Sequence, residues 1–147
     1  MAESQVTKHS ALFNWLGENW GKILFQPDDD LALSAFDKTF AKDIVIKINH
    51  DHAPREAYLA YVTSTRANFD LTLLHAIEVK VWESPNGGGS LVYDGELKYH
   101  DKKTGEEQTG HVVMIVDIRK GDDGELQVVQ TTECVTRSEG SVKTFEG

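Results

Sequence analysis

The chain has 147 residues, of which 27% are charged and 39% hydrophobic, and its formal net charge is -9. This length and composition predict a single globular domain over residues 1–147, with a core at about 5–137 and a loose tail at 138–147. The acidic balance and the lack of a basic cluster argue against a nucleic-acid partner. No segment approaches the roughly 20 apolar residues of a membrane span, and no apolar secretory leader is visible, so we expect a cytoplasmic protein without a membrane partner.

The first half of the chain carries hydrophobic residues at helical spacing in three segments. Asp28, Asp29 and Asp30 supply caps for the second of these helices, and Pro54 stands where the third could start. Between the second and third helices, residues 43–50 alternate as a half-buried strand does. The three helical stripes are Val6, His9, Phe13, Leu16 and Trp20; Leu33, Phe36 and Phe40; and Tyr58, Tyr61, Val62, Thr65 and Phe69.

After Phe69 the hydrophobic period becomes two, which is typical of β-structure. Residues 73–82 and 91–100 read as strands, and residues 110–135 read as a long hairpin around a Gly-Asp-Asp-Gly turn. The predicted order is therefore α-α-β-α-β-β-β-β, an α+β domain. We expect a curved antiparallel sheet wrapped around three helices in the shape of a cone, which can enclose a pocket.

This element order, with FAKDIVIKI at residues 40–48, resembles the nuclear transport factor 2-like superfamily, and in particular its SnoaL-like polyketide cyclase group. The resemblance covers roughly residues 5 to 137. It implies a cone with a pocket at its open end and a homodimer formed through the sheet. The superfamily includes isomerases, dehydratases, epoxide hydrolases, cyclases and non-catalytic binding domains, and the fold does not select among them.

Two departures from known members narrow the activity that the resemblance implies. Ile48 stands where steroid isomerases of this fold carry an aspartate base, and an aliphatic side chain cannot move a proton. Epoxide hydrolases of the fold need Arg-X-Asp on a middle strand, where this chain has Tyr93-Asp94-Gly95-Glu96. Both of these activities are disfavoured, whereas cyclase-like and isomerase-like chemistry stays open.

Glu133 is the first candidate catalytic residue. If the turn at residues 121–124 pairs Lys120 with Glu125, then Val112 lies opposite Glu133, which places the carboxyl on an apolar face of the hairpin. Burial there raises the pKa of a carboxyl group toward the range of general acid–base catalysis. The alternative is that Glu133 lies at the rim of the sheet and pairs with a cation.

Two histidines are further catalytic candidates, as proton partners of Glu133. His111 lies on the opposite face of the same hairpin, and the sequence leaves open which face looks into the cone. His50 continues the face of the preceding isoleucines at the expected mouth; it could equally be a loop residue. His50-X-His52 also invites a metal reading, but the third and fourth ligands are missing, so we expect no metal.

Aromatic side chains on the helices and on the predicted strand at residues 91–100 suit a flat apolar ligand, although plain core packing is the alternative for each. Met114 shares the Glu133 face. The expected ligand contacts are Trp15, Tyr58, Tyr61, Tyr93, Tyr99 and Met114.

The sequence thus favours a cofactor-free isomerase, cyclase or dehydratase that acts on a small apolar metabolite by proton transfer. The competing interpretation is a non-catalytic module of the same fold that binds a small molecule or a protein.

Overall fold

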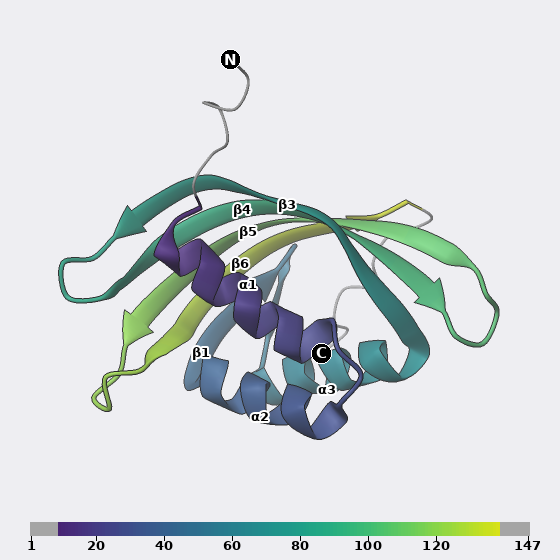
Figure 1. Cartoon of the computed structure of the whole chain (residues 1–147), viewed down its shortest axis with the longest axis horizontal. Helices are drawn as coiled ribbons and strands as arrows, with labels where there is room; N and C mark the ends of the chain where they lie inside the picture. Colours follow the sequence, from purple (N-terminus) through teal and green to yellow (C-terminus); the bar gives the residue numbers. More distant parts are fainter. Residues whose placement is uncertain (1–8, 139–147) are drawn as a thin grey trace, which may run out of the picture.

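The computed structural model describes residues 9–138, which form three helices and a six-stranded sheet (Figure 1). This confirms the expected α+β class and element order, with one short strand, β2, added after β1. The elements are α1 (Ala11–Leu24), α2 (Asp29–Thr39), β1 (Phe40–Ile48), β2 (Asp51–Ala53), α3 (Arg55–Asn68), β3 (Phe69–Glu83), β4 (Gly88–Asp101), β5 (Glu107–Lys120) and β6 (Leu126–Arg137). Residues 1–8 and 139–147, with most of the expected tail, lie outside the described residues.

The sheet has the strand order β2-β1-β6-β5-β4-β3 and is mixed, so the expectation of a wholly antiparallel sheet is wrong at one pair. β6 runs parallel to β1, and every other neighbouring pair is antiparallel. The reason is topological: α3 carries the chain to the far edge of the sheet, and three successive hairpins bring β6 back beside β1 in the same direction.

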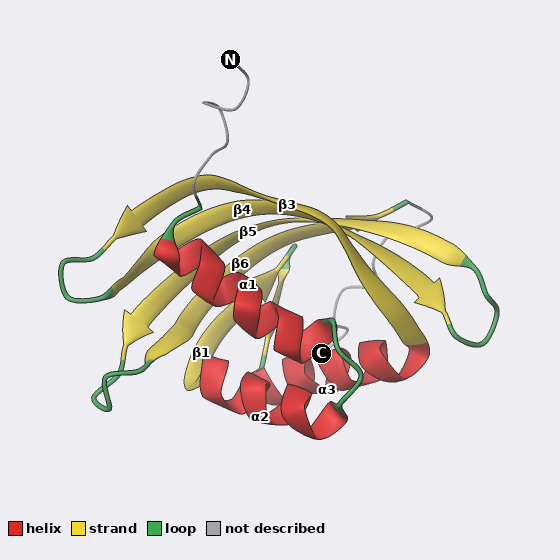
Figure 2. Ribbon diagram, viewed as in Figure 1, coloured by secondary structure: helices red, strands yellow, loops and turns green. Residues whose placement is uncertain are grey.

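All three helices lie on the concave side of the sheet, and α1 crosses beneath the arch (Figures 1 and 2). Their starts follow local chemistry: the Ser10 hydroxyl accepts a hydrogen bond from the Phe13 amide, and the Asp28 carboxylate accepts from the first turn of α2. The aromatic rings of Phe36 and Phe40 are almost fully buried where α2 meets β1. Tyr58 of α3 packs against both rings, so α2, α3 and β1 meet in one aromatic cluster.

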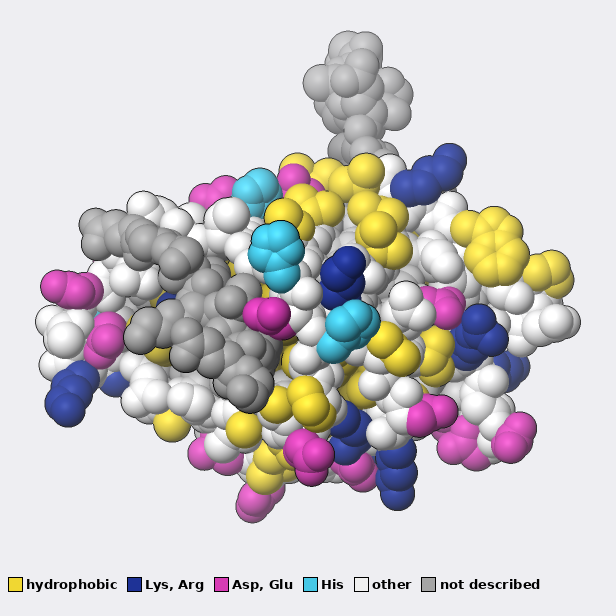
Figure 3. Space-filling view, turned by 180° about the vertical axis from the view of Figure 1, so that it is seen from behind, with side chains coloured by type: hydrophobic (Ala, Val, Ile, Leu, Met, Phe, Trp, Pro, Cys, Tyr) yellow, Lys and Arg dark blue, Asp and Glu magenta, His cyan; other side chains and the backbone are white. Residues whose placement is uncertain are grey.

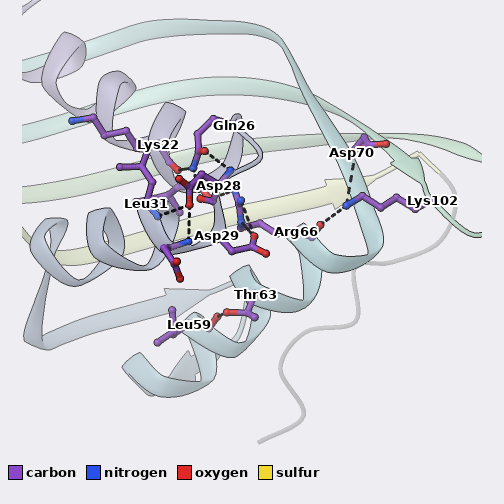
Figure 4. Close-up of polar contacts among 12 residues, drawn as sticks. Lys22, Gln26, Asp28, Asp29, Leu31, Leu59, Thr63, Arg66, Asp70 and Lys102 are labelled. Atoms are coloured by element: carbon purple, nitrogen blue, oxygen red, sulfur yellow. Dashed lines mark hydrogen bonds and ion pairs between the residues drawn. The ribbon is translucent and has the colours of Figure 1, made fainter.

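A network of polar contacts ties the end of α3 to the other helices (Figure 4). Arg66 donates to the Asp29 carboxylate at 2.9 Å and to the carbonyl of Ile23 at 2.9 Å. Lys102, in the turn after β4, donates to the carbonyl of Arg66 at 2.9 Å. These contacts connect α3 to α1, to the start of α2 and to the turn after β4.

The convex face of the sheet exposes several large hydrophobic side chains. Strand alternation places Val113 and Ile115 there, between concave residues of β5, and their exposed fractions are 38% and 52%. Seen from behind, hydrophobic groups lie among histidine and charged side chains (Figure 3). Within residues 9–138, no helix combines the length and the apolar character that crossing a membrane requires.

Candidate functional site

A cavity of about 530 Å³ lies between α1, α3 and the concave faces of β3 to β6. This volume is within the range of small-molecule sites. Gly95 adds to the volume of the cavity because it has no side chain, whereas its neighbours on the concave face of β4 are large. The wall is mostly hydrophobic and consists of Phe13, Leu16, Gly17, Trp20, Gly21, Leu24, Phe25, Ile48, Tyr58, Tyr61, Val62, Thr65, Leu71, Thr72, Leu73, Ala76, Tyr93, Gly95, Leu97, Tyr99, Val112, Met114, Glu133 and Val135.

Glu133 is the one carboxylic acid in the wall of this cavity, as formed by the described residues. Its exposed fraction is 8%. Burial raises the pKa of Glu133 from 4.5 to about 7, against the opposing effect of hydrogen bonds from Tyr58 and Thr131. The Thr131 hydroxyl lies 3.4 Å from Glu133 Oε2. A carboxyl group of this kind exists in both protonation states near neutral pH, as a general acid or base requires.

Two phenols lie near the carboxyl, and an indole lies near one of these phenols. Burial raises the pKa of Tyr58 and of Tyr93 well above their ordinary values, and the nearby Glu133 charge adds to both effects. Both phenols therefore stay protonated. The Tyr93 hydroxyl donates to the sulfur of Met114. The indole N–H of Trp20 is close enough to favour the Tyr93 phenolate slightly, yet it is buried without a hydrogen bond of normal geometry.

The structure corrects the expected hairpin register by two residues. Met114, and not Val112, is the partner of Glu133 across the hairpin. One residue of the difference comes from the turn, since Lys120 pairs with Leu126 and leaves a five-residue loop. The second comes from a β-bulge in the same hairpin, which adds a residue to β6. Successive residues of a strand point to opposite faces, so a shift of two residues leaves Glu133 on the predicted face. The expected burial of Glu133 on an apolar face is therefore confirmed.

Six of the nine residues expected at the site line the cavity, and their chemical roles stay predictions. Trp15, His50 and His111 lie outside its wall. The six residues in the wall are Glu133, Tyr58, Tyr61, Tyr93, Tyr99 and Met114.

Each of the three remaining residues is turned away for an identifiable reason. His111 lies on the convex face, where its ring contacts Asp94 at 2.5 Å. His50 is exposed in a turn, because Asn49 adopts a left-handed conformation with φ of 53° and ends the alternation of β1. Trp15 lies off the stripe of α1 that faces the cavity and is only partly buried.

Trp20, which was expected on a helix that lines the cone but was not named among the ligand contacts, also lies in the wall, on the α1 stripe of residues 13, 16 and 20. A second contributor, Arg137, was not expected. Arg137 lies beside two wall tyrosines and shares the concave face of β6 with Glu133 through strand alternation. Among residues 9–138, no group of three or more histidine, cysteine or acidic side chains could hold a metal ion.

Neither a protein-family model nor a curated protein matches the sequence. Solved structures do match. A conserved protein from Planctomyces limnophilus superposes with a TM-score of 0.71 at 12% identity, over 86% of this chain and 94% of that chain. A ketosteroid isomerase-like protein from Erwinia carotovora atroseptica gives 0.65 at 13% identity, over 88% and 96%. A protein from Pseudomonas aeruginosa described as NTF-2 like, of unknown function, gives 0.65 at 16% identity, over 86% and 98%.

These similarities show that the chain has the fold of nuclear transport factor 2-like proteins, as the sequence resemblance implied. At such identities they carry no activity across, and the SnoaL-like subgroup stays a prediction. One local feature links the fold to the site: Ile48 and Glu133 are direct neighbours on the parallel strands β1 and β6. The resemblance implied that steroid isomerases carry their aspartate base at the position of Ile48. The carboxyl group in this cavity lies instead on the neighbouring strand, β6.

Proposed function

We propose that this protein is a cofactor-free enzyme that moves a proton on a small apolar carbonyl compound, in an isomerisation, cyclisation or dehydration. The observation that carries the proposal is Glu133, a buried carboxyl group with a pKa of about 7, in the wall of an otherwise apolar cavity of about 530 Å³. Similarity of fold to a ketosteroid isomerase-like protein is compatible with it.

Three side chains have separate roles in such a reaction. The Glu133 carboxylate takes a proton from the carbon beside the carbonyl, and the electron pair of the broken C–H bond moves onto the carbonyl oxygen. Tyr58 holds the carboxyl in place through its hydrogen bond. The indole N–H of Trp20, which is buried and makes no hydrogen bond of normal geometry, donates to the oxygen that becomes negative. Protonated Glu133 then returns the proton to the same or another carbon.

The test uses 2-tetralone, a bicyclic apolar ketone with exchangeable hydrogens beside its carbonyl. Exchange of these hydrogens for deuterium is followed by proton NMR with wild-type protein and with Glu133→Gln. We expect the wild type to accelerate exchange and the variant to lose roughly 10²–10⁴-fold of that acceleration while its affinity for the ketone is kept. Glu18→Gln, which removes the same charge from an exposed site on α1, is the matched control and should match the wild type.

If the wild type binds 2-tetralone and accelerates nothing, the proposal of proton transfer to such ketones fails and the non-catalytic binding module is favoured. Equal acceleration by the wild type and Glu133→Gln would remove Glu133 from the mechanism. Two further expectations, the homodimer and the cytoplasmic location, stay predictions.

A further inference from the structure

The concave face of β6 continues beyond Glu133 to a cation. Glu133, Val135 and Arg137 alternate along the strand, and the first two lie in the cavity wall. Four residues at roughly 3.3 Å each place the Cα atoms of Glu133 and Arg137 about 13 Å apart. The two charged side chains therefore stand at different ends of one face, a separation that two or three fused rings could span.

Arg137 is held by an aromatic stack. Its guanidinium carbon lies 4.2 Å from the ring centre of Tyr99 and 5.6 Å from that of Phe69. The Tyr99 ring packs over Gly110, its diagonal neighbour on β5; a Cβ atom at Gly110 would lie 2.5 Å from Tyr99 Cε2. The missing side chain of Gly110 thus makes the room in which the ring and the guanidinium stack.

Not every N–H group of Arg137 has a hydrogen-bond acceptor. Its Nη2 donates to the Tyr61 hydroxyl at 3.4 Å, a long contact, and the guanidinium also hydrogen-bonds the Tyr99 hydroxyl, while its Nε is buried without a partner. Within residues 9–138, no carboxylate lies within 4 Å of the guanidinium. By contrast, Arg55 and Arg66 each pair with an aspartate. A half-buried cation with an unused buried donor is costly unless something anionic completes it.

Two phenols connect this cation to the cavity. Tyr61 and Tyr99 both line the wall, and Arg137 contacts both of them. Burial, together with a hydrogen bond to Tyr61, raises the pKa of Tyr99 to about 12 even though the neighbouring Arg137 lowers it, so Tyr99 keeps its phenol proton at neutral pH. Phenol donors backed by a guanidinium form a good environment for a carboxylate oxygen, because charge-assisted hydrogen bonds are the stronger ones.

We propose that Arg137, Tyr61 and Tyr99 form a subsite for the carboxylate of a planar apolar ligand whose ring system extends along β6 toward Glu133. This deepens the proposed function and rests on it, since it assigns the substrate class to ring compounds that carry one carboxylate remote from the reacting carbon. The phenols contact the carboxylate, and Arg137 supplies the charge behind them.

The test compares two ligands of nearly equal size and shape, 2-naphthoate and 2-naphthamide, by isothermal titration calorimetry at pH 8. We expect wild-type protein to bind the carboxylate roughly 10- to 100-fold more tightly than the amide. Arg137→Gln should remove this preference by weakening naphthoate binding alone, and Arg137→Lys should keep part of it. Arg119→Gln is the matched control, because Arg119 is exposed and already pairs with Asp117; it changes the net charge equally and should leave the preference intact.

The outcomes separate the two proposals. Equal wild-type affinities for the two ligands, or an equal loss of both in Arg137→Gln, overturn the subsite and leave the cavity as a small-molecule site. Failure of both ligands to bind overturns the subsite together with the small-molecule role of the cavity. The wild-type comparison needs no variant, so it decides the matter even if Arg137→Gln does not fold.

Discussion

Replacement of Glu133 by glutamine should make the protein more stable at alkaline pH, although it removes the residue to which we assign catalysis. Burial raises the pKa of the folded-state carboxyl from 4.5 to about 7. At pH 4 and below, the carboxyl is protonated in the folded and the unfolded chain. Between pH 4.5 and about 7, the unfolded chain loses this proton while the folded chain keeps it, so the free energy of unfolding falls as the pH rises.

The difference between the two pKa values corresponds to about 3 kcal/mol of stability lost by the time the pH exceeds 7. Glutamine has nearly the same shape and no charge, so Glu133→Gln should escape this loss. The stability of the variant relative to the wild type should therefore rise by about 3 kcal/mol from pH 4.5 to pH 8.5.

The assay is urea unfolding of both proteins at pH 4.5, 6, 7 and 8.5, with the same slope of free energy against urea required for each comparison. Glu18→Gln serves again as the control for removal of a charge, and its difference from the wild type should change little over this range. A Glu133→Gln difference that is independent of pH would refute the burial argument, because the carboxyl would then titrate alike in the folded and unfolded chains.

Three other predictions follow from single contacts. Tyr58→Phe removes a hydrogen bond that lowers the pKa of Glu133, so that pKa should rise above about 7 in a carbon-13 NMR titration of the carboxyl; an unchanged value would contradict the contact. Phe40→Ala empties a core site with 2% exposure and should cost about 3–5 kcal/mol in urea unfolding; a cost below about 1 kcal/mol would mean that the site is not packed as described. Ile115→Lys places a charge on the exposed convex face, through which we propose that two copies pair; sedimentation should show a wild-type dimer and a variant monomer, and a wild-type monomer would end the dimer proposal.

The fold was predictable because the hydrophobic period changes clearly along the chain. The alternation of residues 43–50 and the long β-branched runs after Phe69 have few structural interpretations besides strands. The short strand β2 was missed, since three residues carry no period. The parallel pairing of β1 with β6 was missed because it depends on the number of hairpins that separate them and on where the α3 crossover leads, not on any residue in either strand.

The candidate site was predictable only in part. Glu133 was predicted on the apolar face of the hairpin, while the side of the sheet that this face looks toward was left open. The prediction of the apolar face holds because side-chain direction depends on the parity of the register, and the turn and the bulge together changed the register by two. His50 was misplaced since one residue, Asn49, leaves the extended conformation and redirects the chain. Arg137 was overlooked, although alternation from Glu133 would have put it on the concave face; its significance depends on the Tyr99 ring that packs over Gly110, which the sequence alone does not reveal.

The most direct test of the central claim, that Glu133 transfers protons inside the cavity, is the pH dependence of deuterium exchange into 2-tetralone between pH 5 and pH 9. The account predicts that kcat/KM rises with pH through a single ionisation near pH 7, and that this rise is absent in Glu133→Gln. A wild-type profile without an inflection near pH 7, or the same inflection in both proteins, would contradict it.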